Sequence, residues 1–371
     1  MAKEYDFLIV GAGLYGSVFA HEAKKAGKKC IIIEKRGHVG GNIYCRKIAD
    51  VIVHQYGAHI FHTNDRGIWN YVNALTPFNN YVNAPLACYK GKLYNLPFNM
   101  NTFNQLWGLT KPDEVKAKIA QQVAAVNIDK PKNLEEQALA MVGKDIYETF
   151  IKGYTEKQWG RKATELPPFI IKRLPLRFSY NNNYFNDRYQ GIPEGGYNKL
   201  INALLKGIEV KLNTDYLENK QELNKKAITI LYTGSLDAFY NFRFGRLNYR
   251  SLRFKHEQIN SNNYQGNAVI NYTDTEIPFT RTIEHQYFDI KNSGKYKKTV
   301  VTREYPQEYN GKNEPYYPIN DEHNMSIYKK YRLVAEKEQN VLFGGRLAEY
   351  RYYDMHQVVA SALKKIRCLF K

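Results

Sequence analysis

The 371-residue sequence lacks any apolar run that approaches the ~20 residues needed to cross a bilayer. We therefore predict no membrane span. Its start, MAKEYDFLIVGAG, leads directly into an apolar segment and lacks the basic, apolar and small-residue regions of a secretory signal. A cytoplasmic location is therefore expected.

Cysteine is scarce. The four cysteines, Cys30, Cys45, Cys88 and Cys368, form no CxxC pair and no other paired spacing. This argues against a disulfide framework, a zinc site and a thiol-disulfide redox centre. We expect ordinary buried or half-buried thiols and predict no metal site.

Acidic residues are outnumbered by basic ones, 36 to 54, which gives a net charge of +18. A charge of this sign and size makes nucleic acid a partner to consider. However, the basic residues are spread along the chain, and none of the usual nucleic-acid-binding motifs appears. A polyanionic small molecule explains the charge as well, so we predict no nucleic-acid partner.

What the sequence does contain is a nucleotide-binding motif at its start. The segment YDFLIVGAGLYGSVFAHEAKKAGKKCIIIEKR predicts a strand, a glycine turn, a helix and a second strand. Gly11 makes the turn, Gly13 allows the backbone to approach a pyrophosphate, and Gly16 allows the helix to pack on the strand. Glu34 at the end of the second strand is placed for a ribose hydroxyl. Together these features predict dinucleotide binding.

The next residues favour FAD over NAD. In KRGHVGGN, Gly40 and Gly41 allow a second close backbone approach, which is typical of flavoproteins. A simple nicotinamide enzyme usually continues into another helix here. No second GxGxxG follows, so no separate NAD(P)H domain is expected, and the missing CxxC disfavours disulfide-reductase-type flavoenzymes.

The end of the chain is also typical of a flavoprotein. VLFGGRLAEYRYYDMHQVVASALKKI predicts a strand, a Gly-Gly-Arg turn and a helix capped by Asp354. The positive N-terminus of this helix would favour anionic reduced flavin, and Arg346 could add a further positive charge. A capped surface helix explains Asp354 equally well, but it does not explain Gly344 and Gly345.

The middle of the chain changes character twice. Helical periodicity from Asn133, which is expected to cap the first helix, to about Trp159, with helical segments at 102–130 and 164–177, predicts an inserted helical domain. Strand-like runs then follow and predict an antiparallel sheet: AITILYTG, GNAVINYTD, RTIEHQYF and KTVVTREYP. The predicted fold is α/β, a Rossmann-like FAD-binding domain with an inserted helical domain and an antiparallel β-sheet domain. The boundaries are 1–80 with 195–235 and 335–371 for the first, 100–180 for the second, and 81–99 with 236–325 for the third.

A set of unusual motifs occurs in order along nearly the whole chain: GAGLYG, HVGGN, YGAHIFHT, LPFNMNTF, IKGYTEKQWGR, NNYF, DRYQGIP, GGYNKLI, FGGRLAEY and YYDMHQV. Together they resemble the bacterial UDP-galactopyranose mutase family of FAD enzymes. The resemblance implies interconversion of UDP-galactopyranose and UDP-galactofuranose for surface polysaccharide. It also implies attack of reduced-flavin N5 on the anomeric carbon, NAD(P)H or another reductant as a transient partner, and a homodimer. His59 and His62 in YGAHIFHT favour the unacetylated sugar over UDP-N-acetylgalactosamine.

The resemblance also implies site residues. The phosphate-binding arginines correspond to Arg173 and Arg281, and the uracil would contact Phe150 and Tyr154. Trp159 would lie in a mobile loop that closes over the nucleotide. The other substrate-binding positions are Asn83, Tyr184, Arg250, Asn271, Tyr317 and Tyr352. Catalytic roles are implied for Arg173, Arg281, His62, Tyr352 and Asp354. The implied cofactor-binding residues are Gly11, Gly13, Tyr15, Gly16, Glu34, Lys35, Gly41, Asn42, His59, Ile60, Arg346, Asp354, Met355, His356, Gln357 and Val358.

Some alternatives remain open. A flavin oxidoreductase of the amine-oxidase type would share the fold but would oxidise its product. A basic protein that binds RNA or membrane and keeps FAD for structure would bind with a steep salt dependence. Within GYTEKQWGRKATELP, Tyr154 and Trp159 could instead anchor the core of the helical domain. His62 could tune the protonation of the flavin or be a packed hydrogen-bonding residue.

Overall fold

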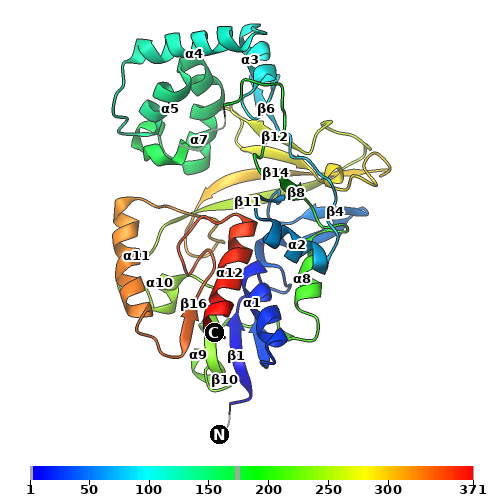
Figure 1. The fold of residues 1–371 in the computed structure, drawn as a ribbon, viewed down its shortest axis with the longest axis vertical. Helices are drawn as coiled ribbons and strands as arrows, with labels where there is room; N and C mark the ends of the chain where they lie inside the picture. Colours follow the sequence, from blue (N-terminus) through cyan, green and yellow to red (C-terminus); the bar gives the residue numbers. More distant parts are fainter. Residues whose placement is uncertain (1–2, 172–175, 371) are drawn as a thin grey trace.

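Two sheets and a helical cluster follow one another along the long axis of the molecule (Figure 1). The computed structural model describes residues 3–171 and 176–370. The helical cluster lies at one end, a parallel sheet with the two chain termini at the other, and a larger sheet between them. Within the described residues, no helix combines the length and the apolar composition that a bilayer crossing requires.

The first sheet is parallel throughout. Its strands lie in the order β16 (Val341–Phe343), β10 (Ala227–Tyr232), β1 (Tyr5–Val10), β2 (Cys30–Ile33) and β9 (Glu209–Lys211). The apolar runs FLIV and CIII are almost fully buried, as expected for strands covered on both faces. Helices α1 (Leu14–Lys25) and α12 (Met355–Leu369) pack together against this sheet through side chains such as Val18, Phe19 and Val359.

The second sheet is almost entirely antiparallel. Its order is β15 (Tyr317–Pro318), β11 (Tyr249–Ile259), β14 (Thr299–Glu308), β13 (Arg281–Glu284), β12 (Val269–Tyr272), β6 (Leu86–Tyr89) and β7 (Lys92–Asn95). β12 and β6 pair in parallel. The prediction of an antiparallel sheet was wrong for AITILYTG, because Ala227–Tyr232 is β10 and pairs in parallel with β1. Fully buried strands carry no alternation that would distinguish the two cases.

The helical cluster comprises α3 (Met100–Trp107), α4 (Pro112–Val126), α5 (Leu134–Val142), α6 (Lys144–Ile146), a π-helical turn (Tyr147–Ile151) and α7 (Lys152–Trp159). Asn133 caps α5 by accepting the N–H of Glu136, as predicted. The helix predicted at 164–177 is wrong in the described part, which forms two short 3₁₀ turns, Ala163–Glu165 and Pro168–Ile171. Residues 172–175 lie outside the described residues.

The remaining elements connect these three parts. They are a 3₁₀ turn (Gly41–Ile43), β3 (Cys45–Ile48), β4 (Val51–His54), β5 (Phe61–Thr63), α2 (Arg66–Leu75), β8 (Tyr189–Gly191), α8 (Tyr197–Leu204), α9 (Lys220–Leu223), α10 (Leu236–Phe239), a 3₁₀ turn (His285–Phe288) and α11 (Glu322–Ala335). β5 pairs with β8, and β3 pairs with β4.

Two buried histidines join β4 to the larger sheet. The Nδ1 of His285 accepts the backbone N–H of His54 at 3.2 Å, and the Nδ1 of His54 accepts the N–H of His59 at 3.2 Å. A ring nitrogen that accepts carries no proton, so both imidazoles are neutral. Burial lowers the pKa of His54 to about 3, and burial, followed by His54 and His256, lowers the pKa of His285 well below its usual value.

This pair predicts a loss of stability in mild acid. Each histidine binds a proton in the unfolded chain below about pH 6.5 but not in the folded protein, so unfolding becomes easier as the pH falls from 6.5. Each histidine should remove about 1.4 kcal/mol of unfolding free energy per pH unit below 6.5. Urea unfolding at pH 7 and pH 5.2 measures the change before most carboxylates titrate. Equal midpoints at the two pH values would contradict the prediction.

Candidate active site

One cavity of about 730 Å³ extends from the glycine turn after β1 to the helical cluster. At one end it is lined by Gly13, Gly40 and Gly345, and at the other by Phe150 and Trp159. Many of the predicted site residues line it: Gly13, Tyr15, Gly16, Asn42, His59, Ile60, His62, Asn83, Phe150, Tyr154, Trp159, Tyr184, Asn271, Arg281, Tyr317, Arg346, Tyr352, Asp354, Met355 and Val358. Others lie outside the lining: Gly11, Glu34, Lys35, Gly41, Arg250, His356 and Gln357.

The three glycines of GxGxxG are needed for different reasons. Gly11 has φ +105°, and a Cβ at Gly16 would lie 2.1 Å from the Gly11 carbonyl oxygen, so the fold itself requires both. Gly13 has φ −75°, and a Cβ there would meet Gly41 Cα at an ordinary 3.9 Å. No atom of the described residues excludes a Cβ at Gly13. Its bare backbone at the cavity wall therefore fits a diphosphate that approaches the N-terminus of α1.

Behind this turn lies a group of charged residues. The carboxylate of Glu34, which is 6% exposed, accepts the backbone N–H groups of Ala12 and Arg36, each at 2.9 Å. Arg36 donates to Glu314 at 2.8 Å and to Asn42 at 3.1 Å. Sequence reasoning missed Arg36. Arg36 pairs with Glu314, 278 positions away, and such a distant pair leaves no pattern in the local sequence. The only local sign of a role at this site is that a basic residue follows the acidic end of the strand.

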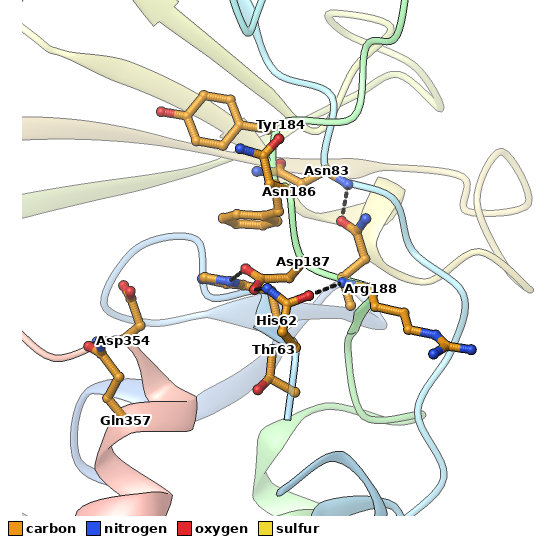
Figure 2. A network of polar contacts seen from close by, with 12 residues as sticks. His62, Thr63, Asn83, Tyr184, Asn186, Asp187, Arg188, Asp354 and Gln357 are labelled. Atoms are coloured by element: carbon orange, nitrogen blue, oxygen red, sulfur yellow. Dashed lines mark hydrogen bonds and ion pairs between the residues drawn. The ribbon is translucent and has the colours of Figure 1, made fainter. Parts of the chain in front are cut away.

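The N-terminus of α12 forms another part of the wall. Gln357 accepts the backbone N–H of Asp354 at 2.9 Å, and the two residues lie together at the start of the helix (Figure 2). The positive end of the helix therefore faces the cavity beside Met355 and favours a negative charge there. His356 does not line the cavity, but its ring centroid lies 5.2 Å from that of His62, and burial, followed by His62, lowers its pKa.

His62 on β5 is held from two directions. Its Nδ1 lies 2.5 Å from Asp187 Oδ2, and the ring of Phe185 stacks on the imidazole with centroids 3.8 Å apart. Figure 2 shows the carboxylate of Asp187 beside the imidazole, with Asp354 farther along the cavity. The sequence analysis assigned no role to Phe185 or Asp187, although Phe185 belongs to the motif NNYF and Asp187 is the first residue of the motif DRYQGIP.

Arg281 on β13 is the central cation of the sheet wall. It donates from Nη2 to the Tyr154 hydroxyl at 2.8 Å, and its Nε lies 3.3 Å from a carboxylate oxygen of Glu304, which is 2% exposed. Burial opposes the charge, but Glu304 and then Tyr154 outweigh it, so the pKa of Arg281 is raised. Arg281 is therefore a permanent cation, and Glu304 fixes the position of the guanidinium.

Amide and phenol groups complete this wall. Asn271 is the register partner of Arg281 on β12. Among the described residues, the side-chain oxygens of Asn83 and Asn271 are buried and accept no hydrogen bond. They present acceptors to a ligand with hydroxyl groups. The rings of Tyr317 and Tyr352 stack with centroids 5.5 Å apart, and Tyr352 is 56% exposed.

The segment GYTEKQW lies in helix α7, as the helical periodicity up to about Trp159 predicted. α7 contains Tyr154 and Trp159 and ends at Gly160, which has φ +65°. Lys157 on this helix donates to three backbone carbonyls, those of Tyr272, Ile277 and Phe279, at 2.8–3.1 Å. α7 is thereby fastened to the strands that carry Arg281 and Asn271.

The predicted aromatic and arginine residues of this region have mixed placements. Phe150 packs on Tyr94 and Phe98 in the core of the helical cluster, and Trp159 contacts the same core, so both are structural anchors as well as cavity residues. Arg250 donates from Nε to the carbonyl of Gln158 at 3.0 Å and pairs with Glu308 behind α7, outside the cavity lining. Arg173 lies outside the described residues.

Comparison with known proteins gives concordant results. Residues 149–352 match a family model described as UDP-galactopyranose mutase, and residues 9–75 match an NAD(P)-binding Rossmann-like domain. The chain is 42% identical to a probable UDP-galactopyranose mutase of Klebsiella pneumoniae over 97% of this chain and 93% of that one. It is 37% identical to a dTDP-fucopyranose mutase of Escherichia coli, over 96% of each chain.

Solved structures support the fold. A crystal structure of reduced UDP-galactopyranose mutase superposes with a TM-score of 0.76 at 13% identity, over 99% of this chain and 95% of that one. A putative protoporphyrinogen oxidase from Exiguobacterium sp. 255-15 superposes with a TM-score of 0.66 at 13% identity, over 100% and 99% of the two chains. The predicted α/β architecture with a Rossmann-like domain is therefore confirmed.

Proposed function

Because the chain belongs to the UDP-galactopyranose mutase family, we propose that it is an isomerase that interconverts UDP-galactopyranose and UDP-galactofuranose with FAD as its cofactor. We also propose that its product serves bacterial surface polysaccharide. The observation that supports this most is the shape of the site. One cavity joins the bare backbone at Gly13, which would take a diphosphate, to a half-buried cation at Arg281, which suits a dinucleotide cofactor and a sugar nucleotide placed together.

The residues at the end of the cavity beside the glycine turn fit FAD. Gly13 and Gly40 would take its diphosphate, and the start of α12 would favour an anionic ring system. When bound, reduced FAD would supply N5 as a nucleophile for the anomeric carbon of the sugar. The chain supplies position and charge.

The residues at the end of the cavity beside the helical cluster fit UDP. Arg281 would bind the diphosphate with a fixed, charged fork whose orientation Glu304 maintains, and it would stabilise UDP as the leaving group. Tyr184, Tyr317 and Tyr352 would donate to the same oxygens. Phe150 and Tyr154 would pack against the uracil. The buried amide oxygens of Asn83 and Asn271 would accept hydrogen bonds from the sugar.

Product analysis tests this proposal. Protein reduced with dithionite under anaerobic conditions should convert UDP-galactofuranose into UDP-galactopyranose over many turnovers, and the oxidised protein should not. Parallel assays with dTDP-fucopyranose test whether the chain instead accepts the sugar nucleotide for which the E. coli relative is named. Turnover of that substrate alone would overturn the choice of sugar nucleotide. Oxidation of a substrate with one equivalent of oxygen or another acceptor consumed per product would favour the amine-oxidase alternative.

A further inference from the structure

Asp187 approaches His62 because their strands pair. His62 lies opposite Gln190 in the β5–β8 ladder, and Asp187 lies just before β8. The side chains of His62 and Asp187 are 14% and 20% exposed, and their contact of 2.5 Å is a strong, largely desolvated hydrogen bond. His62 lines the cavity, whereas Asp187 stands behind it.

The carboxylate of Asp187 is itself fixed. Its Oδ1 accepts from the side-chain amide of Asn64 at 2.6 Å, and the amide oxygen of Asn64 accepts the backbone N–H of Arg188 at 2.9 Å. Figure 2 shows the side chain of Arg188 extending away from the imidazole. Both carboxylate oxygens are thus engaged, and the Phe185 ring holds the plane of the imidazole.

The contact with Asp187 determines which nitrogen of His62 always carries a hydrogen. An ionised carboxylate can only accept a hydrogen bond, so Nδ1 of His62 carries a hydrogen whether the imidazole is neutral or charged. The exchangeable proton is therefore the one on Nε2. The charged groups near the ring, besides Asp187, are Asp354 and His356 on α12. One ring nitrogen of His62, one ring nitrogen of His356 and one carboxylate oxygen of Asp354 lie within 4.8 Å of one another.

We propose that His62 and Asp187 form the proton-transfer pair of this site, with Asp187 as a positioning residue that fixes the tautomer of His62. The inference rests on the proposed function. Conversion of a galactopyranose to a galactofuranose breaks the C1–O5 bond and forms a C1–O4 bond, so one proton must leave O4 and one must reach O5. Protonated His62 gives its Nε2 proton to O5 and takes the O4 proton back. The imidazolium is regenerated without a co-reactant, and the Asp187 carboxylate balances its charge.

The test compares Asp187→Asn with the matched control Arg188→Gln, which alters a neighbouring exposed charge without touching the pair. Asp187→Asn should lower kcat about 10- to 100-fold with KM changed less than about threefold, since general acid-base contributions are of this size or larger. The alkaline limb of its pH–kcat profile should move to lower pH. His62→Gln should show a similar loss of kcat, and its pH–kcat profile should lack the alkaline limb. Arg188→Gln should retain the kcat and pH profile of the unsubstituted protein.

A second measurement does not depend on activity. FAD-loaded, oxidised protein should show a strongly deshielded ring N–H proton in its ¹H NMR spectrum, which is absent in Asp187→Asn and His62→Gln and present in Arg188→Gln. FAD content and melting temperature confirm that each variant is folded. An unchanged kcat and pH profile in Asp187→Asn, or no such N–H signal in the unsubstituted protein, would overturn the inference. Failure of the unsubstituted protein to isomerise any sugar nucleotide, with the N–H signal present, would overturn the proposed function instead.

Discussion

Replacing Arg281 by alanine should lower kcat/KM for UDP-galactofuranose about 30- to several-thousand-fold, which corresponds to roughly 2–5 kcal/mol for the loss of one charge-assisted partner of the bound diphosphate. The substitution removes the cation proposed for the diphosphate and also the hydrogen bond to Tyr154. The loss should appear in both KM and kcat, because UDP must be held before and after it departs. Steady-state kinetics of the FAD-loaded, reduced protein measure it.

Glu304 determines the controls for this experiment. Removal of Arg281 leaves a buried carboxylate without its ion partner, and this can destabilise the fold. Arg281→Lys keeps a cation near Glu304 but loses the fork, so it should fold normally and show an intermediate loss. Flavin content and melting temperature separate unfolding from loss of function. A kcat/KM within about threefold of the unsubstituted value in a folded Arg281→Ala protein would remove Arg281 from the proposed site, since the expected loss is at least 2 kcal/mol.

Gly13→Val should abolish stable FAD binding while the apoprotein remains folded. The backbone at Gly13 has an ordinary extended conformation, and a Cβ there meets only Gly41 Cα at 3.9 Å. The added methyl groups therefore project where the diphosphate would lie. We expect FAD affinity to fall by at least about tenfold, or 1.4 kcal/mol. Flavin absorbance per protein after dialysis, and titration of apoprotein with FAD, provide the measurement.

Gly11→Ala is the informative comparison. Gly11 has φ +105°, and a Cβ would lie 2.2 Å from the Thr233 hydroxyl, so this variant should lose stability even without FAD. Gly13→Val should keep the apoprotein melting temperature, and Gly11→Ala should lower it. If Gly13→Val instead retains FAD after dialysis, the diphosphate does not lie at this turn.

Features that depend on neighbouring residues could be predicted from the sequence. The turn at Gly11 and Gly16, the caps at Asn133 and Asp354, and the strand IIIE follow from local backbone geometry and hydrophobicity. α7 lies within the helical stretch predicted from Asn133 to about Trp159, but the contacts that hold it in place come from outside the segment and could not be predicted. Gly153 packs against the carbonyl of Thr273, and Lys157 is bound by three carbonyls of the next sheet. Neither contact produces an amphipathic pattern.

The same limit applies to the site. Arg250 was expected to bind substrate, but it pairs with Glu308, 58 positions away, and donates to the carbonyl of Gln158 at the end of α7, outside the cavity lining. Asp187 and His62 are 125 positions apart and meet only because β5 pairs with β8. Such pairs are products of strand register, which a local reading of the sequence does not contain.

The order of strands in the parallel sheet has a consequence for biosynthesis. β1 and β2 lie in the first 33 residues, but their sheet is extended by β9 and β10 from the middle of the chain and is completed at one edge by β16 near its end. At about 5–20 residues per second, roughly 15–60 s separate the synthesis of β2 from that of β16. For about the first 10–40 s of that interval, until β9 and β10 have been made, β1 and β2 can pair only with each other. The helical cluster, formed by consecutive helices with a core of their own, can fold much earlier. The two N-terminal strands therefore wait for β9 and β10 before both of their edges are paired, and the outer edge of β10 waits for β16.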